Sequence, residues 1–487
     1  MLKKLLFLVA LVALWVALLW FAIGIDLSKH GNVSLVAMHL LPPLALWASW
    51  LGWRAWQTRQ QAADEAAEAE ATRTALDKQR AESREKFDQD LAERRAGVDF
   101  RWLQVRDLSK QENTESLAMT TDEMTVTLLD EEMSEIADET ADAWPGVQLT
   151  ELFAALLAQC PAALTFPVYL LGPSSRAFAD LSRMVCAARE SALPQLETAW
   201  PQNIALGAVL GLPQSSASPQ ELIDLCATQP ELPGVLVLAF ESPLSNAQHG
   251  EEEPNPETKQ REQWFGKAGQ ALVGMLLTSP VLPSVLAQLG EIAPDGAHDV
   301  MTPFWERTQL APGMISALAP LPADWRQTLA DMPMIAQLRR PAWIEVEEKA
   351  RPTQVTQSLR RLLELAGINA ALIEPTFQFG GEASDEARAP ALQLSDSAWL
   401  IHNAGGVAVC GSRLAGVGSA LSDAGMDLNP INEGTNTVLH AGDCGRATPY
   451  LMLGLAAAKA AELQKPTLVT HFQAHHVAMS FVLPASA

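Results

Sequence analysis

The segment from Asn436 to Phe472 decides the fold and reads NTVLHAGDCGRATPYLMLGLAAAKAAELQKPTLVTHF. It contains an apolar run, a loop with two glycines, a long run of small and apolar residues from Pro449, and a second apolar run. This order predicts a strand, a loop, a helix and a second strand. Runs rich in Val, Leu and Ile are typical of strands buried in a sheet.

A second segment has the same order of elements. It runs from Asn203 to Phe240 and reads NIALGAVLGLPQSSASPQELIDLCATQPELPGVLVLAF. In each segment a hydroxyl residue precedes a proline, at Ser218–Pro219 and Thr448–Pro449, as an N-cap precedes the first helical position. Either the chain holds two related halves, or similar physics produced both segments by chance. We adopt two related α/β halves, over 99–310 and 340–487, with a connector over 311–339.

Short apolar runs alternate with helical patterns through both halves. This alternation favours an α/β fold with mainly parallel sheets. The predicted strands are Leu164–Leu171, Ile204–Leu210, Val235–Phe240, Trp343–Val346, Trp399–His402, Val407–Cys410, Thr437–His440, Thr467–Phe472 and Ala478–Leu483. The predicted helices are Ser175–Leu193, Pro219–Thr228, Glu262–Leu289, Gln327–Leu338, Thr356–Ala366, Leu414–Asp423 and Pro449–Gln464.

Two apolar stretches open the chain. Leu5–Ile25 has 21 residues without a charge, enough for a helix to cross a hydrocarbon core of about 30 Å. No small-x-small cleavage site follows it, which argues against a signal peptide. Val33–Trp53 predicts a second crossing, and residues 1–56 then form a transmembrane hairpin. Basic residues flank the hairpin on both sides, so the positive-inside rule places both flanks in the cytoplasm.

Residues 57–98 follow the hairpin and are rich in Ala, Glu, Gln, Lys and Arg, which are strong helix formers. Few of them are apolar apart from alanine, and no heptad pattern is sustained. We predict a solvated, charged spacer helix held by charge pairs four residues apart. A helix that drives oligomerisation is the alternative.

The net charge of −23 is concentrated in one part of the chain. Residues 1–110 carry a net charge of +2, and residues 111–487 carry −25. A body this acidic repels phosphate backbones, which excludes nucleic acid as a partner. The acid-rich stretch 121–144 is either a solvated face or a docking site for a basic partner.

Familiar catalytic and metal motifs are absent. The sequence has no G-x-S-x-G, no Walker loop, no H-E-x-x-H and no CxxC pair. Cys444, in the loop that follows Asp443, would need a base such as His402 to act as a nucleophile, and a structural loop is the preferred interpretation. We predict no catalytic residue, no cofactor and no metal, although one group of histidines comes nearest to a metal cluster: His440, His471, His475 and His476.

The second half resembles the thiolase and ketoacyl-synthase superfamily. Ala441–Val469, AGDCGRATPYLMLGLAAAKAAELQKPTLV, is similar to that family's closing Gly-His loop, small-residue helix and following strand. Asp443 stands where the family's catalytic histidine is expected, and no nucleophile motif surrounds Cys160 or Cys186. The resemblance implies a thiolase-like fold whose active site is lost. A degenerate enzyme acting on acyl substrates is the alternative function; it would need Cys160 or Cys186 at a helix N-terminus facing His440, His471 or His475.

The layout of the whole chain resembles a family of proteobacterial proteins, some of which are type VI secretion adaptors. The resemblance rests on the anchor, the charged helix, the acidic body and two phrases, GVLVLAFESPLSNA (Gly234–Ala247) and TNTVLHAGDCGRATPYLMLGLA (Thr435–Ala456). It implies a non-enzymatic adaptor in the bacterial inner membrane. Its cytoplasmic body would bind an antibacterial lipase effector and target it to the secretion spike.

Overall fold

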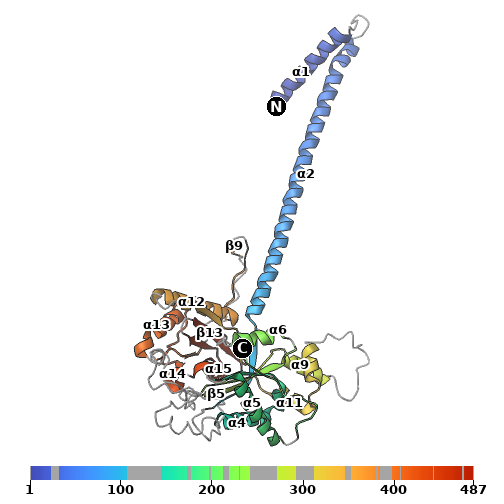
Figure 1. The fold of residues 1–487 in the computed structure, drawn as a ribbon. Helices are drawn as coiled ribbons and strands as arrows, with labels where there is room; N and C mark the ends of the chain where they lie inside the picture. The colour runs from blue at the N-terminus through green and yellow to red at the C-terminus, as the bar shows by residue number, and fades with distance from the viewer. Residues whose placement is uncertain are drawn as a thin grey trace. The chain divides into compact units, whose positions relative to one another are not determined.

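The computed structural model describes residues 2–23, 32–106, 144–172, 177–196, 199–211, 219–229, 231–241, 271–291, 312–345, 352–379, 382–383, 397–405, 407–442, 444–473 and 476–485 (Figure 1). The chain divides into two compact units, Met1–Phe87 and Asp88–Ala487. The acid-rich stretch 121–144 lies, except for Trp144, outside the described residues.

The first unit is built from two helices. Helix α1 (Leu2–Leu18) continues as a π-helix, η1 (Leu19–Ile23), and helix α2 spans Asn32–Arg94 and so runs on into the second unit. The indole N–H of Trp15 donates to the Met38 carbonyl at 3.1 Å, and that of Trp20 donates to His39 Nε2 at 3.1 Å. These bonds hold α1 against the first turns of α2.

The structure does not support a transmembrane hairpin over residues 1–56. Within the described parts of the chain, no helix combines the length and the apolar character that a membrane crossing requires. Helix α1 has 17 residues, and α2 carries Pro42 and Pro43 inside it as well as His39. Later turns of α2 carry charge pairs such as Lys78–Glu82 (3.9 Å), four residues apart.

One large mixed sheet organises the second unit. Its order is β11-β10-β12-β13-β6-β1-β5-β4-β2-β3, with β7 paired to β13. The strands are β1 (Gly97–Arg106), β2 (Val168–Leu171), β3 (Val209–Gly211), β4 (Gly234–Glu241), β5 (Ala271–Thr278), β6 (Ala336–Arg339), β7 (Ala342–Glu345), β10 (Trp399–His402), β11 (Gly434–Asn436), β12 (Thr467–Phe472) and β13 (His476–Pro484); β8 (Gln378–Phe379) and β9 (Glu382–Ala383) pair separately.

The same strand order occurs twice, once on each side of the β1–β6 pair. Outward from the middle, the first half runs β1-β5-β4-β2-β3 and the second runs β6-β13-β12-β10-β11. In each half one inner strand, β2 or β10, is parallel to both of its neighbours. The halves meet where β1 and β6 pair antiparallel, with Gly97 opposite Arg339. This repeated topology is the pattern that a duplication produces.

A buried polar network accompanies the β1–β6 joint. Asp99 on β1 accepts from the Gln337 amide of β6 at 3.2 Å and lies 3.5 Å from the Arg101 guanidinium. Burial raises the pKa of Asp99, and the nearby arginine opposes that rise. Arg101 also donates to the Met332 carbonyl at 2.7 Å, so the network ties β1 to the segment that leads into β6.

The prediction of mainly parallel sheets is wrong. Among the described strands, parallel pairing is confined to β2 with β3 and β4, and to β10 with β11 and β12. The remaining pairs are antiparallel, because the chain does not always insert a crossover helix between neighbouring strands. Only residues 473–475 separate β12 from β13, and a parallel pair needs a connection of a dozen residues or more.

Several predicted elements keep their bounds and others change type. Trp399–His402 and Thr467–Phe472 are strands as predicted. Val407–Cys410 instead opens helix α13 (Val407–Asp423), and Thr437–His440 lies in helix α14 (Thr437–Ala441). The predicted helix Glu262–Leu289 contains β5 and part of α9 (Leu282–Glu291). Strand β5 is buried along its whole length, so its sequence shows no alternation that would separate strand from helix.

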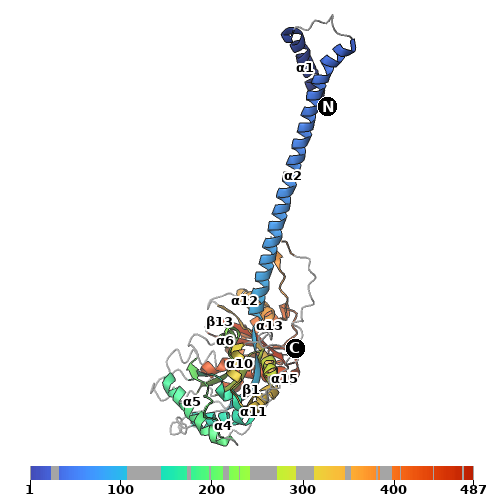
Figure 2. The same cartoon turned by 90° about the vertical axis from the view of Figure 1, so that its right-hand side faces the viewer.

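The helices form three layers: one on the outer face of each half of the sheet, and one between the two halves (Figures 1 and 2). Helices α4 (Trp144–Gln159), α5 (Phe178–Ala192), α9, α10 (Pro312–Leu318) and α11 (Ala323–Asp331) cover the outer face of the first half. Helices α12 (Pro352–Asn369) and α13 cover the outer face of the second half. Helices α6 (Gln220–Thr228) and α15 (Thr448–Leu463) share the middle core with the inner faces of both halves.

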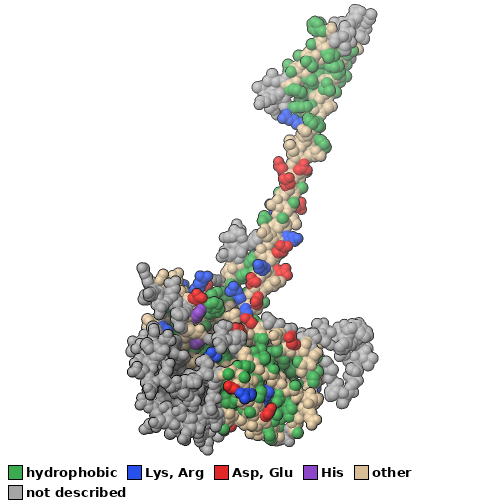
Figure 3. Space-filling model, viewed as in Figure 1, with side chains coloured by type: hydrophobic (Ala, Val, Ile, Leu, Met, Phe, Trp, Pro, Cys, Tyr) green, Lys and Arg blue, Asp and Glu red, His purple; other side chains and the backbone are tan. Residues whose placement is uncertain are grey.

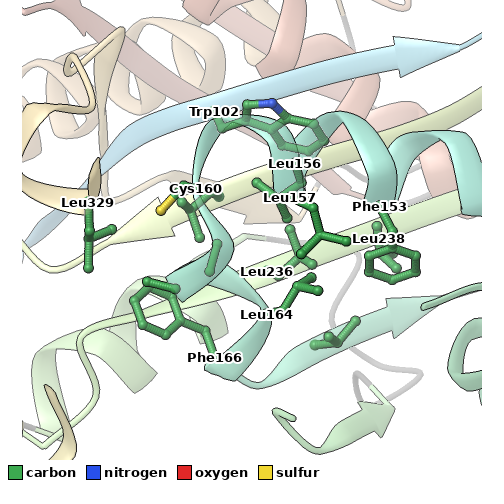
Figure 4. Close-up of a cluster of buried hydrophobic side chains, with 14 of the residues drawn as sticks. Trp102, Phe153, Leu156, Leu157, Cys160, Leu164, Phe166, Leu236, Leu238 and Leu329 are labelled. Carbon is green, nitrogen blue, oxygen red and sulfur yellow. The ribbon is translucent and has the colours of Figure 1, made fainter. Parts of the chain in front are cut away.

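The core of the first half's outer layer joins α4 to the sheet. Figure 4 shows Trp102 of β1, Phe153 and Leu156 of α4, and Leu236 and Leu238 of β4 gathered into one cluster. Strands and helix contribute large apolar side chains on facing surfaces, as layered α/β packing requires.

Helix α15 lies at the centre of the second unit. Every residue from Thr448 to Ala460 is buried, and many of these residues are alanine. A Cβ at Gly454 would lie 3.0 Å from Leu103 Cδ1, so the helix approaches β1 closely because it has no side chain there. The N-cap is Ala447, so the predicted hydroxyl cap at Thr448 is wrong; the equivalent Ser218 lies outside the described residues.

Gly454→Val tests this close approach. The added side chain has no room against Leu103, and overpacking of this kind costs typically about 1–3 kcal/mol. We expect a lower thermal unfolding midpoint than in the wild type. The matched control is Gly418→Ala, also in a helix, whose Cβ would meet Pro430 at an ordinary 3.6 Å. It should leave the midpoint unchanged or raise it, and equal losses in the two variants would contradict the account.

Candidate functional site

The most polar part of the described core lies at the carboxyl ends of three neighbouring strands. Asn436 of β11, His402 of β10 and Thr470 of β12 are register partners, so their side chains leave one face of the sheet in a row. We call these three residues the strand-end row. All three are more than nine-tenths buried. Ligands of α/β proteins commonly bind outside the carboxyl ends of parallel strands, which makes this row the candidate site.

His402 has both ring nitrogens bound to the backbone. Its Nδ1 accepts from the Ala404 N–H at 3.3 Å, and its Nε2 lies 3.3 Å from the Pro430 carbonyl. A carbonyl can only accept and a peptide N–H can only donate, so these partners assign the proton to Nε2. Burial lowers the pKa of His402 to about 4, against a smaller opposing effect of the Pro430 bond. The ring is therefore neutral near pH 7.

Asn403 continues the sheet beyond its last strand pair. Its amide nitrogen donates to the Phe472 carbonyl at 2.9 Å, and its amide oxygen accepts from the Phe472 N–H at 2.7 Å. One side chain thus replaces a pair of backbone hydrogen bonds. It fixes the end of β10 to the end of β12.

The side chains of Asn436 and Thr437 form hydrogen bonds with the backbone at the end of β10 and in the turn that follows it. The amide of Asn436 donates to the Gly405 carbonyl at 2.8 Å, and the Thr437 hydroxyl donates to the His402 carbonyl at 3.3 Å. These bonds connect the end of β11 and the start of α14 to the turn after β10. The polar groups at this edge therefore mainly hold loops in place.

Two polar atoms of the strand-end row have no hydrogen-bond partner within the described residues. Asn436 Oδ1 and Thr470 Oγ1 are buried and have no hydrogen-bond partner within the described parts of the chain. An unpaired buried polar atom costs about 1–3 kcal/mol, so a group that hydrogen-bonded to either atom would stabilise this edge. In the first half the equivalent register partners on β2, β3 and β4 are Leu170, Gly211 and Leu238, so the described first half has no polar row there.

Among the cysteines whose side chains the structure describes, none forms a hydrogen bond with His402. Cys444 is buried directly before the 3-10 helix η8 (Gly445–Ala447), and its thiol donates to the Ala441 carbonyl at 3.4 Å. Burial raises the pKa of Cys160 to about 11 and that of Cys226 to about 12. Such thiols stay protonated near pH 7 and are poor nucleophiles. Asp443 and the side chain of Cys410 lie outside the described residues.

The cysteine–histidine pairing required by the enzyme alternative is not formed in the described residues. Cys186 lies within α5 and not at its N-terminus. Cys160 precedes the short 3-10 helix η4 (Pro161–Thr165) in the outer core of the first half, whereas His471 lies on β12 of the second half. The side chain of His440, and His475 as a whole, lie outside the described residues.

Metal-binding groups do not converge in the described regions, where no set of three or more His, Cys, Asp or Glu side chains could hold an ion. His476 lies on β13 with its Nε2 3.6 Å from Glu345 Oε1, and His471 lies on β12 opposite Ala478.

Sequence reasoning named His402 but missed Asn403 and Asn436. Both asparagines directly end or follow a short strand, and that position is the signal that could have found them. Their role depends on which backbone groups meet them, at Phe472 and Gly405, and these are distant in the sequence.

His402 makes folding stability depend on pH in a defined direction. Its pKa is about 4 in the folded chain and near 6.5 in the unfolded chain. Between these values the unfolded chain binds a proton that the folded chain does not, so falling pH favours unfolding. The contribution is fully present above pH 6.5 and is lost towards pH 4, by roughly 3 kcal/mol in all.

His402→Gln should therefore lose less stability than the wild type on going from pH 7.5 to pH 4.5. The measurement is the thermal unfolding midpoint of both proteins at each pH. Every other titrating group is common to the two proteins and cancels in the difference. Parallel losses in the two proteins would show that His402 is not held neutral.

Comparison with known proteins finds similarity to solved structures alone, and this similarity lies in the course of the backbone. No protein-family model matches the chain, and no curated protein matches it. A 3-oxoacyl-[acyl-carrier-protein] synthase III from Aquifex aeolicus VF5 is 9% identical, with 80% of this chain and 100% of that one covered, at a TM-score of 0.39. The dimeric peroxisomal thiolase of Saccharomyces cerevisiae is 9% identical, with 80% and 98% covered, at a TM-score of 0.42.

A 3-oxoacyl-(acyl carrier protein) synthase III from Pseudomonas aeruginosa PAO1 is 12% identical, with 80% of this chain and 98% of that one covered, at a TM-score of 0.37. The second unit has a mixed α/β fold with one large sheet. None of these matches supports the predicted membership of a type VI adaptor family, which stays a prediction.

Proposed function

We propose that this protein is an adaptor: its second unit binds a protein cargo, and its first unit attaches it to a membrane. The observation that carries the proposal is the engagement of both ring nitrogens of His402 and both amide atoms of Asn403 with backbone groups. A general base needs a ring nitrogen within reach of the proton it removes. The histidine at the strand ends offers none, so the edge serves as a rigid frame.

The charge of the body supports cargo binding. Residues 111–487 carry a net charge of −25. A field of one sign accelerates encounter with a partner of the opposite sign and makes the association sensitive to salt. The cargo would accordingly present a basic surface.

The surface of the first unit supports membrane attachment. Figure 3 shows hydrophobic side chains over the helices at the N-terminal end, and acidic and basic side chains along the later turns of α2. The exposed apolar residues include Leu14, Trp20, Phe21 and Leu41. Large exposed apolar surfaces mark sites of protein or membrane interaction. Under this proposal the protein sits at the bacterial inner membrane, with the second unit in the cytoplasm.

The cargo we propose is an antibacterial lipase effector, which the adaptor would deliver to the spike of a type VI secretion system. This part of the proposal rests on the resemblance in layout. The acidic second unit would supply the docking surface.

Affinity capture of the full-length protein from membranes of its native cells tests the adaptor function. The proposal expects a lipase-type effector and a spike protein among the captured proteins. Their amounts should fall as salt rises from about 0.05 M to about 0.5 M, because salt shortens the Debye length and so screens the attraction between opposite charges. A matched control uses detergent-solubilised membranes without the tagged protein. Capture that recovers neither class of protein would contradict the proposal.

An enzyme acting on acyl substrates is the second candidate. It is favoured by the two unpaired polar atoms of the strand-end row, Asn436 Oδ1 and Thr470 Oγ1, at an edge where α/β proteins bind ligands. Release of free thiol from acyl-coenzyme A by the purified full-length protein, lost in Asn436→Ala, would establish this function. The adaptor proposal expects no release above the buffer background.

A further inference from the structure

Strand β7 presents an aromatic ring and a carboxylate side by side on one exposed face. Ala342 and Ile344 of this strand pack into the core under α12. Side chains alternate along a strand, so Trp343 and Glu345 leave the opposite face, about 7 Å apart along it. Both residues are exposed, and Trp343 keeps 53% of its surface accessible.

His476 of β13 holds these two side chains together. It is the register partner of Glu345, and its Nε2 lies 3.6 Å from Glu345 Oε1. Its ring also lies against the Trp343 ring, with 5.8 Å between centroids and 58° between the planes. The three residues therefore form one platform on two hydrogen-bonded strands, which we call the β7 platform.

Among the described strands, β7 pairs with β13 alone and lies off the main path of the sheet. An edge strand offers unpaired N–H and C=O groups to an extended segment of another chain. Every second side chain of such a segment would lie over the face that carries Trp343 and Glu345.

A cationic side chain fits the chemistry of this platform. The face of a tryptophan ring attracts a guanidinium or ammonium group, and a carboxylate beside it adds a charge-assisted hydrogen bond. Arginine suits both contacts better than lysine, because its planar group stacks on rings and binds carboxylates. Tryptophan is also among the residues most enriched at the energetic centres of protein interfaces.

We propose that the β7 platform binds an arginine side chain presented on an extended segment of a partner protein. The inference rests on the proposed function of cargo binding and names the surface and the chemistry through which binding occurs. The net charge of −25 over residues 111–487 favours the same basic partner.

The test uses the purified full-length protein in detergent and a fluorescein-labelled peptide, Thr-Arg-Thr-Arg-Thr, with Thr-Gln-Thr-Gln-Thr as the matched probe. Fluorescence anisotropy measures both affinities. The arginine peptide should bind about tenfold more tightly than the glutamine peptide, given the strength of a cation–π contact and a partner carboxylate. Trp343→Ala should weaken arginine-peptide binding about tenfold, and Glu345→Gln about threefold.

Ile431→Ala is the control, since Ile431 is also an exposed apolar residue but lies on the loop before β11, at the far edge of the sheet. It should bind as the wild type does. The thermal unfolding midpoint of each variant should match that of the wild type, because the side chains of Trp343 and Glu345 lie on the surface. If one of these two variants unfolds at a lower temperature, the peptide affinity of the other variant decides the test. Absence of arginine-peptide binding at millimolar concentration, equal affinity for the two peptides, or unchanged affinity in Trp343→Ala would overturn the proposal.

The same variants separate this inference from the adaptor function. If the wild type captures a lipase effector and Trp343→Ala captures it equally well, the adaptor function stands and the platform is wrong. If arginine-peptide binding depends on Trp343 but no effector is captured, the platform stands and the cargo proposal is wrong.

Discussion

Burial of helix α15 between the two halves of the sheet is the constraint on which the rest of the second unit depends. Every residue from Thr448 to Ala460 is buried, so this part of the helix has no solvated face. At Gly454 the absence of a side chain lets the helix lie close to β1, since an added Cβ would be 3.0 Å from Leu103 Cδ1. Because α15 cannot shift, the loop that leads into it through Cys444 is fixed as well. That loop and α14 follow directly on β11, one of the three strands whose ends form the candidate site.

The two halves share a topology but differ in chemistry. The β1–β6 pair relates one strand order to the other, and Asp99, Arg101 and Gln337 make the joint a buried polar network. Yet the row of register partners in the described first half is Leu170, Gly211 and Leu238, whereas the row in the second half is His402, Asn436 and Thr470. In the second half these polar groups are used mainly to bind backbone. These bonds from the histidine and the asparagines make the β10–β12 edge of the second half rigid.

The sequence predicts correctly those helices and strands whose type follows from the composition of a few neighbouring residues. Thr467–Phe472 and the helix from Thr448 were found because a β-branched run and a small-residue run differ in composition. Val407–Cys410 was misassigned because four apolar residues satisfy either a strand or a helix. Strand β1 was missed altogether, since its alternate residues face two different cores and include the buried Asp99 and Arg101. The role of Asn403 is beyond sequence reasoning, because its partner Phe472 is 69 residues away.

The central claim is that His402 is a neutral, backbone-bound residue and not a base. Long-range 1H–15N correlation spectra of histidine-labelled protein test it directly, with His402→Gln assigning the signal. The account predicts a proton on Nε2, none on Nδ1, and no change of this signal as pH falls from 7.5 to 5.5, because the pKa is about 4. A His402 ring that titrates near pH 6.5, or that carries its proton on Nδ1, would contradict it.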